Sequence, residues 1–462
     1  DNMRFFHDSW DNKFKEPFGA LTPNKECKIS ILVEELKENY SIYLVVYKDG
    51  FWAKNDARYI YMEKVSDNMF TCRVSFKEIG YYFYYFEVKT NDNTIFIVKD
   101  KDSNKSVISE NLFFKWQITV YDEKLDFLKT GFEDSAMYQI FPDSFYYEQL
   151  NIEKLPGDRI IVDTTYQIRV DEDQRKNIKN NKYYGGNLKG IIKKLDYLKK
   201  LGVGIIYLNP IFEAHSNHRY NTADFMNVDP LLGTNEDFCM LCEEAKKRDI
   251  FIVLDGVFNH VGADSIYFNK NKRYKDDPGA YNSKESKYYP FFEKSFYDYP
   301  TLYKGWWGDP INLVALDTVS LDYIRFICGE NGVIHTWLKR GAAGFRLDVI
   351  DELSNDLIDD ICCSTRKYGG LIIIGEVWED ATSKFDEKGN RRRYLLGDQI
   401  DSVMNYPFLE SSIEYVRDGK ASNFYNTIMT ILDHYPKHAI NNLMNSLSTH
   451  DKERVRNRLA AE

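Results

Sequence analysis

The sequence predicts an α/β fold in which a (β/α)8 barrel without its last strand follows an N-terminal antiparallel β-sandwich and carries a subdomain inserted after the third barrel strand. Two observations predict it. Strand-like segments without a helical period fill residues 26–120, and from residue 137 onward short apolar runs alternate with amphipathic helical stretches. Near-continuous apolar strands that alternate with helices are typical of a parallel sheet covered by helices.

The N-terminal segments alternate β-branched or aromatic residues with polar ones. Examples are CKISILVEEL, SIYLVVYK and YYFYYFEVKT, and turn-forming clusters such as Lys48-Asp49-Gly50 separate several of them. A period of two residues in short segments bounded by turns indicates antiparallel strands. We therefore expect residues 1–125 to form a small β-sandwich domain.

Seven apolar runs follow, and each suits a buried parallel strand. They span residues 137–142, 204–212, 249–258, 342–350, 369–378, 399–408 and 443–451. Amphipathic stretches such as LKGIIKKLDYLKKLG and NEDFCMLCEEAKKRD precede several of them. Seven strands are one short of the number that closes such a barrel. We assign residues 126–462 to this domain and expect its last strand to be missing.

The stretch from about residue 260 to residue 319 lacks this alternation. It is crowded with Tyr, Phe, Lys, Asp and Pro, and it is too long for a simple connection between two elements. We expect an inserted subdomain there. Residues 148–186 form a second polar excursion, which we expect to be a surface loop.

The composition excludes several classes of function. Hydrophobic residues make up 43% of the chain and charged residues 29%, which is ordinary for a globular protein. A net charge of −10 argues against nucleic-acid binding, which needs a basic patch. No run approaches the roughly 18 apolar residues of a membrane span, and the N-terminal residues lack the apolar core of a secretory signal. We expect a cytoplasmic protein without nucleic-acid or membrane partners.

Aromatic residues and cysteines leave two questions open. Aromatic residues reach 15% of the chain, which fits either core packing or the binding of sugar rings, and composition does not separate the two. Cys239 and Cys242 form a CxxC in an amphipathic helical stretch and have no second pair at zinc-site spacing. We expect these two cysteines to be structural instead of metal-binding or redox-active.

Carboxylates directly follow four of the apolar runs: Asp255 after FIVL, Asp348 after GFRL, Glu376 after LIIIG and Asp451 after SLSTH. The C-terminal ends of the strands of such a barrel form one face, and active sites lie there. One carboxylate at a strand end is commonly a helix cap. Four on one face indicate a functional cluster, because packing carboxylates together is unfavourable unless they are used.

Arg346 precedes Asp348 by two residues, so the two side chains point the same way from one strand. A fixed cation at this place would keep Asp348 ionised and therefore nucleophilic. The alternative interpretation is a buried structural ion pair.

Four segments together resemble the signature motifs of the α-amylase family of glycoside hydrolases. They are DGVFNH (255–260), GFRLDVIDE (344–352), GEVWED (375–380) and STHD (448–451), in the order found in that family. SNHRYNTADF (216–225) and YGGNLKG (184–190) further resemble its neopullulanase, cyclomaltodextrinase and maltogenic amylase branch. The resemblance covers essentially the whole chain and implies a TIM barrel behind an N-terminal β-sandwich.

The resemblance implies a retaining hydrolase. By motif, Asp348 would be the nucleophile, Glu376 the general acid/base, and Asp451 the residue that holds sugar hydroxyls and stabilises the oxocarbenium-like transition state. Asp255 would support Arg346 instead of reacting. Retaining chemistry needs the nucleophile and the acid roughly 5 Å apart, which neighbouring strands can provide. Glu376 would need a raised pKa, which a carboxylate neighbour such as Asp348 would supply.

The same motifs imply contacts with the substrate. Tyr220 would stack under the sugar ring to be cleaved, and His260 and His450 would hydrogen-bond its hydroxyls. Trp378, in the motif GEVWED, is also assigned to the substrate pocket.

No cofactor is expected. Asn259 matches a position that binds calcium in many α-amylases, but the neopullulanase branch often lacks that ion, so calcium is not predicted. His215 and His218 have no acidic residue at the spacing of a metal site. We assign both histidines to the loop and the substrate pocket.

The expected partner is an α-glucan, either an oligosaccharide or a polysaccharide. The resemblance implies hydrolysis of α-1,4-glucosidic bonds in maltooligosaccharides, cyclodextrins, pullulan or starch. A transglycosylase of the same family and a non-catalytic glucan-binding protein are the alternatives. The N-terminal domain is expected to bind glucan through Phe51, Trp52 or Tyr61, with core packing as the alternative, and to mediate a homodimer. Because the chain ends at Glu462, soon after Asp451, we expect the eighth strand and the family's C-terminal β-domain to be absent.

Overall fold

The computed structural model describes residues 4–34, 39–49, 56–149, 158–163, 180–294, 303–306 and 309–460. The chain divides into two compact units. Unit 1 combines Asp1–Lys129 with Val377–Glu462, and unit 2 is Thr130–Glu376.

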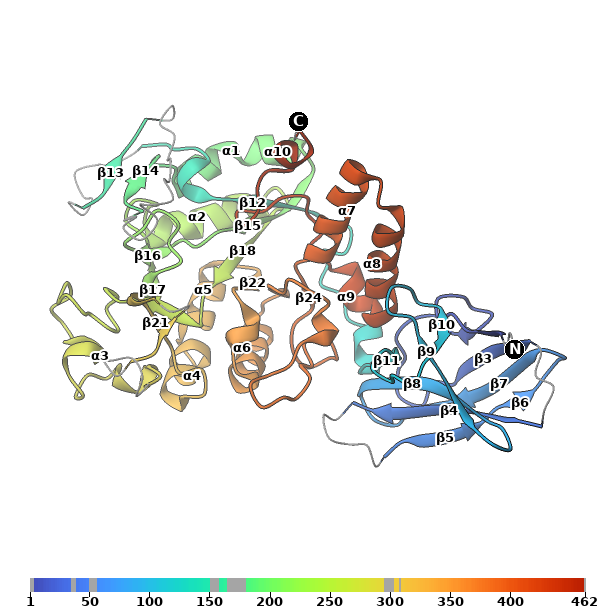
Figure 1. Cartoon of the computed structure of the whole chain (residues 1–462). Helices are drawn as coiled ribbons and strands as arrows, with labels where there is room; N and C mark the ends of the chain where they lie inside the picture. Colours follow the sequence, from blue (N-terminus) through green and yellow to red (C-terminus); the bar gives the residue numbers. More distant parts are fainter. Residues whose placement is uncertain are drawn as a thin grey trace. The chain divides into compact units, whose positions relative to one another are not determined.

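Two antiparallel sheets form the first part of unit 1 (Figure 1). One contains, in spatial order, β1 (Arg4–Phe6), β3 (Cys27–Glu34), β7 (Met69–Val74) and β6 (Glu63–Lys64), with β2 (Lys15–Glu16) paired to β3. The other contains β10 (Ser106–Ile108), β9 (Thr94–Lys99), β8 (Gly80–Lys89), β4 (Ser41–Lys48) and β5 (Arg58–Tyr61), with β11 (Trp116–Val120) paired to β8.

Apolar and polar residues alternate along these strands, and the apolar side chains of both sheets form one hydrophobic core. Ile29 and Ile31 of β3 and Leu44 of β4 are completely buried and belong to one cluster with Phe86 and Trp116. The indole N–H of Trp116 donates to the Asn104 carbonyl oxygen at 2.8 Å, so this large side chain is buried without an unpaired polar group. Of the three aromatic residues named for glucan binding, Tyr61 is 58% exposed, and Phe51 and Trp52 lie outside the described residues.

The second part of unit 1 is mostly helical. It contains β24 (Ser402–Val403), α7 (Tyr406–Asp418), α8 (Ala421–His434), α9 (Lys437–Asn441) and α10 (Val455–Leu459), besides the short 3-10 turns η1 (Glu123–Asp126) and η7 (Ala381–Ser383). The Asn405 side chain accepts from the backbone N–H of Phe408 and caps the start of α7, and Gly419 ends that helix in the left-handed conformation. These are standard helix boundaries.

The strand predicted over residues 443–451 is wrong. A single parallel bridge joins Met404 to Met444, and no strand is described there. Leu447 is 46% exposed. Polar residues follow Leu443 and Met444 almost without interruption, so this segment lacks the continuous apolar run that a buried strand requires.

Unit 2 contains a parallel sheet, as the sequence predicts. Its strands, in spatial order, are β12 (Ala136–Ile140), β15 (Val203–Leu208), β18 (Phe251–Gly256), β22 (Gly344–Leu347) and β23 (Ile372–Gly375). Each of the four adjacent pairs is parallel. All residues of β22 and β23 are buried, which fits strands covered on both faces.

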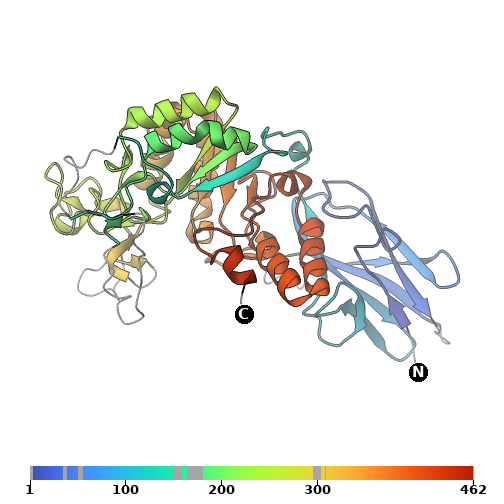
Figure 2. The same cartoon turned by 90° about the horizontal axis from the view of Figure 1, so that it is seen from above.

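Helices alternate with these strands. They are α1 (Leu188–Lys200), α2 (Asn235–Lys246), α4 (Leu321–Cys328), α5 (Val333–Arg340) and α6 (Asn355–Lys367). Figure 2 shows α1 and α2, both in green, side by side along the sheet, and each packs against the strand that follows it. Thr234 and Asp237 form a reciprocal capping box at the start of α2, which satisfies two backbone donors that the first helical turn leaves open.

Shorter elements complete unit 2. They are η2 (Pro142–Ser144), β13 (Ile160–Ile161), β14 (Lys182–Tyr183), β16 (Phe212–Ala214), β17 (Thr222–Val228), β19 (His260–Gly262), α3 (Gly279–Asn282), η5 (Tyr289–Phe291), β20 (Gly305–Trp306), β21 (Asp309–Ala315) and η6 (Ile350–Glu352). Strands β19, β21 and β20 form a small antiparallel sheet between β18 and β22 in the chain. The domain limits at residues 125, 260 and 319 stay predictions.

No helix of the described residues is long and apolar enough to cross a membrane. The seven cysteines are free thiols, and Cys242 of the CxxC is buried in α2.

Gly344 at the start of β22 tests the packing of the parallel sheet. A Cβ built on Gly344 would overlap the carbonyl oxygen of Ile372 on β23, and a backbone oxygen in a paired strand cannot move aside. We expect Gly344→Ala to lower the free energy of unfolding by about 3 kcal/mol, measured by urea titration. Gly204→Ala is the matched control, because its Cβ would meet the Ser135 side chain. Equal losses for both variants would contradict this packing.

Candidate active site

Three carboxylates lie at the C-terminal ends of neighbouring parallel strands. Asp255 is the penultimate residue of β18, Asp348 directly follows β22, and Glu376 directly follows β23. These residues are 2%, 6% and 5% exposed. The register places Asp255 beside Arg346 of β22, so the strands themselves bring these groups together.

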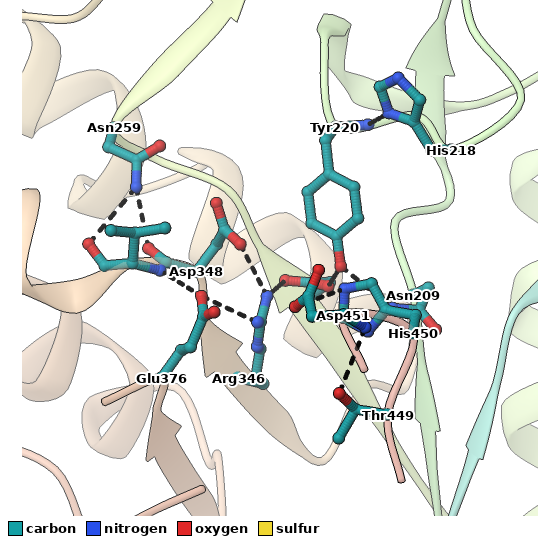
Figure 3. A network of polar contacts seen from close by, with 12 residues as sticks. Asn209, His218, Tyr220, Asn259, Arg346, Asp348, Glu376, Thr449, His450 and Asp451 are labelled. Atoms are coloured by element: carbon teal, nitrogen blue, oxygen red, sulfur yellow. Dashed lines mark hydrogen bonds and ion pairs between the residues drawn. The ribbon is translucent and has the colours of Figure 1, made fainter. Parts of the chain in front are cut away.

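Arg346 contacts all three carboxylates, and Figure 3 shows it beside Asp348 and Glu376. Its Nη1 donates to Asp255 Oδ1 at 2.7 Å and to Asp348 Oδ1 at 2.9 Å, and its Nη2 lies 2.9 Å from Glu376 Oε2. The guanidinium is 1% exposed. A planar fork with several N–H donors is suited to this arrangement, whereas a single ammonium is not.

The cluster has three carboxyl groups for one buried cation. Burial raises the pKa of Asp348 well above its ordinary value, Arg346 lowers that pKa, and the carboxylates of Asp255 and Glu376 raise it. Arg346 thus acts in the direction expected from the sequence, because it favours the ionised form of Asp348, but burial and the two neighbouring carboxylates act against it. A site of this composition holds a proton more strongly than isolated carboxyl groups do.

Asp255 is fixed through its second oxygen. Tyr207 and Tyr220 each donate a hydroxyl hydrogen bond to Asp255 Oδ2 at 2.7 Å. Asn209 Nδ2 donates to the Tyr220 hydroxyl oxygen at 3.0 Å, and Gln139 donates to Asn209 Oδ1 at 2.9 Å. This network makes Asp255 a support for Arg346, and it holds the ring of Tyr220 beside the cluster.

The turn after Asp348 has an unusual backbone conformation. Val349 has φ 40° and ψ 61°, in the left-handed region, which costs a β-branched residue of the order of 1–2 kcal/mol. The backbone N–H of Val349 donates to Glu376 Oε2 at 2.7 Å. Asn259 Nδ2 donates to the Asp348 carbonyl oxygen at 2.9 Å and lies 3.5 Å from the Val349 carbonyl oxygen. Figure 3 shows this amide above the turn.

His260 is buried against Trp306, with the ring centroids 4.0 Å apart. Its Nε2 lies 2.7 Å from the Tyr220 carbonyl oxygen, and its Nδ1 lies 2.5 Å from Asn259 Oδ1. Burial lowers the pKa of His260 to about 3, and a neutral ring donates to only one of these two oxygens. Both ring nitrogens therefore face protein atoms, and a hydrogen bond to a sugar requires one of these contacts to open.

Three of the other predicted site residues, Trp378, His450 and Asp451, belong to unit 1. His450 Nε2 lies 3.2 Å from Asp451 Oδ2. Trp378 is 38% exposed and stacks in parallel on Tyr406, with centroids 3.9 Å apart, and Lys452 Nζ lies 4.9 Å above the Trp378 ring. Unit 1 thus presents an exposed indole, and the carboxylate of Asp451 contacts the ring of the neighbouring histidine. The structure brings Asp255, Arg346, Asp348 and Glu376 together within unit 2.

Residues 139–462 match the family described as alpha amylase, catalytic domain. The chain belongs to the α-amylase family. It is 31% identical to an amylopullulanase of Thermoanaerobacter thermohydrosulfuricus over 98% of this chain and 33% of that protein. It is also 31% identical to neopullulanase 2 of Thermoactinomyces vulgaris over 70% of this chain and 51% of that protein.

Solved structures of α-amylase family proteins share the fold. A cyclic α-maltosyl-(1→6)-maltose hydrolase from Arthrobacter globiformis matches with a TM-score of 0.59 and 26% identity, over 72% of this chain and 69% of that one. A cyclomaltodextrinase matches with a TM-score of 0.61 and 22% identity, over 96% of this chain and 72% of that one. The chain spans between a quarter and half of the length of the first curated relatives, with shares of 33%, 37%, 26% and 51%.

Some residues of this α-amylase site were not found from the sequence. Tyr207 and Asn209 lie in the run GIIYLNPIF. Tyr207 follows Ile205 by two residues and so shares a face of β15 with it, which is a usable signal. Val349 has no sequence signal, because its role depends on a backbone angle. Tyr406 lies below Trp378 only because α7 places it there.

Asn259, which matches a position that binds calcium in many α-amylases, contacts other protein atoms in this chain. The amide group of Asn259 contacts two carbonyl oxygens and His260, so its donor nitrogen and its oxygen are both used. Within the described residues, no group of three or more His, Cys, Asp or Glu side chains is arranged to hold a metal ion.

The buried pair of Asp255 and Arg346 is expected to be essential for stability. Asp255→Asn removes a charge from a pair that water does not reach, and breaking such a pair costs about 3 kcal/mol or more. We expect a clearly lower urea midpoint for this variant. Asp196→Asn is the control, because Asp196 forms an exposed pair with Arg248 and exposed pairs contribute little. Comparable destabilisation by the two substitutions would contradict the importance of burial.

Proposed function

We propose that this protein is a retaining glycoside hydrolase that cleaves α-1,4-glucosidic bonds. The observation that carries the proposal is the Arg346-centred cluster of Asp255, Asp348 and Glu376 at the strand ends of an α-amylase family chain. Asp348 and Glu376 come from neighbouring strands and contact the same guanidinium, which supports the proximity that a double displacement requires.

In the proposed reaction, a carboxylate oxygen of Asp348 attacks the anomeric carbon of the substrate. The bond to the glycosidic oxygen breaks, and Glu376 donates its proton to that oxygen. A water molecule then loses a proton to Glu376 and attacks the same carbon, which releases Asp348. The proton count closes after each turnover, and two inversions give net retention of the α configuration.

The cluster fits this sequence of protonation states. Nucleophile and acid must together hold one proton before the first step, and the raised pKa of Asp348 reflects that burial retains a proton within the cluster. When a carboxylate oxygen of Asp348 begins to bond to the anomeric carbon, the guanidinium of Arg346 stabilises the negative charge that remains on the carboxylate. Asp255 keeps this guanidinium in place and takes no part in bond making.

Further substrate contacts follow from the family assignment. We propose that Asp451 and His450 hold sugar hydroxyls, that Tyr220 and Trp378 stack on sugar rings, and that His260 contacts the ring to be cleaved. Tyr220 is fixed through its hydroxyl and Trp378 through its stack on Tyr406. Aromatic rings that are already held lose little conformational entropy when a sugar binds.

The proposed substrates are maltooligosaccharides, cyclodextrins, pullulan or starch. Relatives at about 30% identity are named amylopullulanase, neopullulanase and cyclomaltodextrinase, and these names refer to starch-type glucans, pullulan and cyclodextrins. A panel of starch, pullulan, β-cyclodextrin and maltotriose separates them. Chromatography of the products separates hydrolysis from transglycosylation, because transfer yields longer oligosaccharides or isomers.

The finer architecture is also proposed. The five parallel strands of unit 2 belong to an eight-stranded barrel, residues 260–319 form a subdomain inserted after the third strand, and the N-terminal sandwich mediates a homodimer. Light scattering of the full chain measures the last of these directly.

Removing either reacting carboxylate should abolish hydrolysis. We expect Asp348→Asn and Glu376→Gln each to lower kcat for maltotriose by more than about 1,000-fold, measured as reducing-sugar release. NMR should show the α anomer as the first product of the unchanged protein. Glu379→Gln is the control, because this glutamate in the same motif is exposed. Full activity of either reacting-site variant, or a β anomer formed first, would refute the proposal.

Arg346→Lys should move the acidic limb of the pH–rate profile. Arg346 lowers the pKa of Asp348, and a lysine cannot contact three carboxylates with one ammonium. The pKa of Asp348 then rises, and because Asp348 reacts only when ionised, the acidic limb of kcat/KM moves to higher pH by about one unit. Arg248→Lys, at an exposed pair, should leave the limb in place. An unmoved limb in Arg346→Lys would contradict this role.

A further inference from the structure

The left-handed turn between the two reacting carboxylates has no assigned role in the proposed function. Val349 is the only β-branched residue among the described non-glycine residues with positive φ, and it directly follows Asp348. A conformation of this kind persists only where surrounding contacts hold it. The contacts that hold this turn are therefore informative.

The turn is fixed from two sides. Asn259 Nδ2 donates to the carbonyl oxygen of Asp348 at 2.9 Å and lies 3.5 Å from that of Val349. On the other side, the Val349 N–H donates to Glu376 Oε2 at 2.7 Å. Asn259 is 2% exposed, so these contacts do not compete with bulk water.

We propose that Asn259 is a positioning residue for the general acid/base: it holds the left-handed turn, and the turn aims the Val349 N–H at Glu376 Oε2. This inference rests on the proposed function. It makes one peptide responsible for two tasks, because the residue that precedes the turn is the nucleophile and the N–H within the turn orients the acid.

The contacts of Oε2 determine which oxygen carries the transferable proton. Oε2 accepts a hydrogen bond from the Val349 N–H at 2.7 Å and lies 2.9 Å from the cationic Arg346 Nη2 in an ion pair. A carboxyl O–H at this oxygen would point its proton at the Val349 N–H and at a cation, whereas a carbonyl-type oxygen accepts the hydrogen bond and faces the positive charge favourably. Glu376 therefore carries its proton on Oε1. In the first step the Oε1–H bond breaks, the proton joins the leaving oxygen, and Oε2 keeps its hydrogen bond to the Val349 N–H.

Loss of Asn259 should release the turn. The Val349 peptide then relaxes to negative φ, its N–H leaves Oε2, and the orientation of the acid is lost. The nucleophile keeps its own contact with Arg346. The defect should consequently appear where the leaving group needs a proton, and not where it leaves without one.

Two substrates with different leaving groups test this in the full chain. Asn259→Ala should lower kcat for maltotriose about 100-fold with little change in KM, whereas kcat for α-maltosyl fluoride should fall less than about fivefold, because fluoride departs with little help from an acid. An equal loss on both substrates would overturn the proposal, since it would indicate a misplaced nucleophile or a damaged fold.

Asn269→Ala is the matched control. Asn269 is fully buried, and its Nδ2 donates to two carbonyl oxygens, those of Tyr274 at 2.8 Å and Asp277 at 3.1 Å. It thus makes the same kind of contact as Asn259 at a turn that carries no reacting group. Any activity loss in this variant should be the same for both substrates. A preference like that of Asn259→Ala would overturn the proposal.

Rescue of activity tests the turn itself. Glycine adopts positive φ without steric strain, so Val349→Gly should let the turn form without Asn259. In the Val349→Gly background, Asn259→Ala should lower kcat for maltotriose less than about tenfold, which is non-additive with the single change. A full 100-fold loss in that background would overturn the proposal.

Thermal unfolding tests the turn without any activity. While Asn259 holds the left-handed conformation, Val349→Gly should have a higher Tm than Val349→Ala, because alanine is strained there. After Asn259→Ala the turn is relaxed, and the order should invert, since glycine then brings only its larger entropy in the unfolded chain. The same order in both backgrounds would overturn the clamp.

The two proposals fail in different ways. If the unchanged protein cleaves neither maltotriose nor α-maltosyl fluoride, the proposed function fails, and inversion of the glycine and alanine order still supports Asn259 as the holder of the turn. If the unchanged protein cleaves both substrates and the variants show neither substrate preference nor inversion, the function stands and the positioning role of Asn259 is refuted.

Discussion

The guanidinium of Arg346 is the group on which the rest of the site depends. It is buried, it donates hydrogen bonds to Asp255 and Asp348, it forms an ion pair with Glu376, and it supplies the cation among these three acids. Desolvating so many charges is costly unless each has a partner. The two tyrosine hydroxyls on Asp255 and the Val349 N–H on Glu376 provide the additional partners that make the cluster tolerable.

In unit 2 the regular strands and the strained turn at Val349 have different roles in this arrangement. Strands β18 and β22 set the distance between Asp255 and Arg346 through their register, and close backbone approach at Gly344 keeps β22 against β23. The strained peptide at Val349 then connects the ends of β22 and β23. Regular structure therefore provides position, and one irregular residue provides orientation, which is a common division where geometry must be accurate.

Unit 1 contributes a different kind of surface. Trp378 is exposed, and one face of its ring stacks on Tyr406. It lies two residues after Glu376 in the chain. The motif GEVWED thus runs from a buried carboxyl group to an exposed ring within a few residues. A short peptide can in this way carry both a reacting group and a group suited to stack on a sugar ring.

The sequence alone determined the parallel sheet of unit 2, the strand-end carboxylates and the family, because continuous apolar runs and short motifs are local properties. It also placed Arg346 on the same side as Asp348, since side chains alternate along a strand. It failed for the strand at residues 443–451, where a few apolar residues imitated a run that the polar neighbours interrupt.

Tertiary structure decided what depends on burial and on backbone angles. Whether Arg346 keeps Asp348 ionised depends on how many carboxylates share the cation and how little water remains, and neither quantity is local in sequence. The hydroxyls of Tyr207 and Tyr220 meet at Asp255 only through the fold. The side chain of Val349 does not predict its left-handed conformation, because the contacts from Asn259 and Glu376 that hold it come from the segments that follow two other strands.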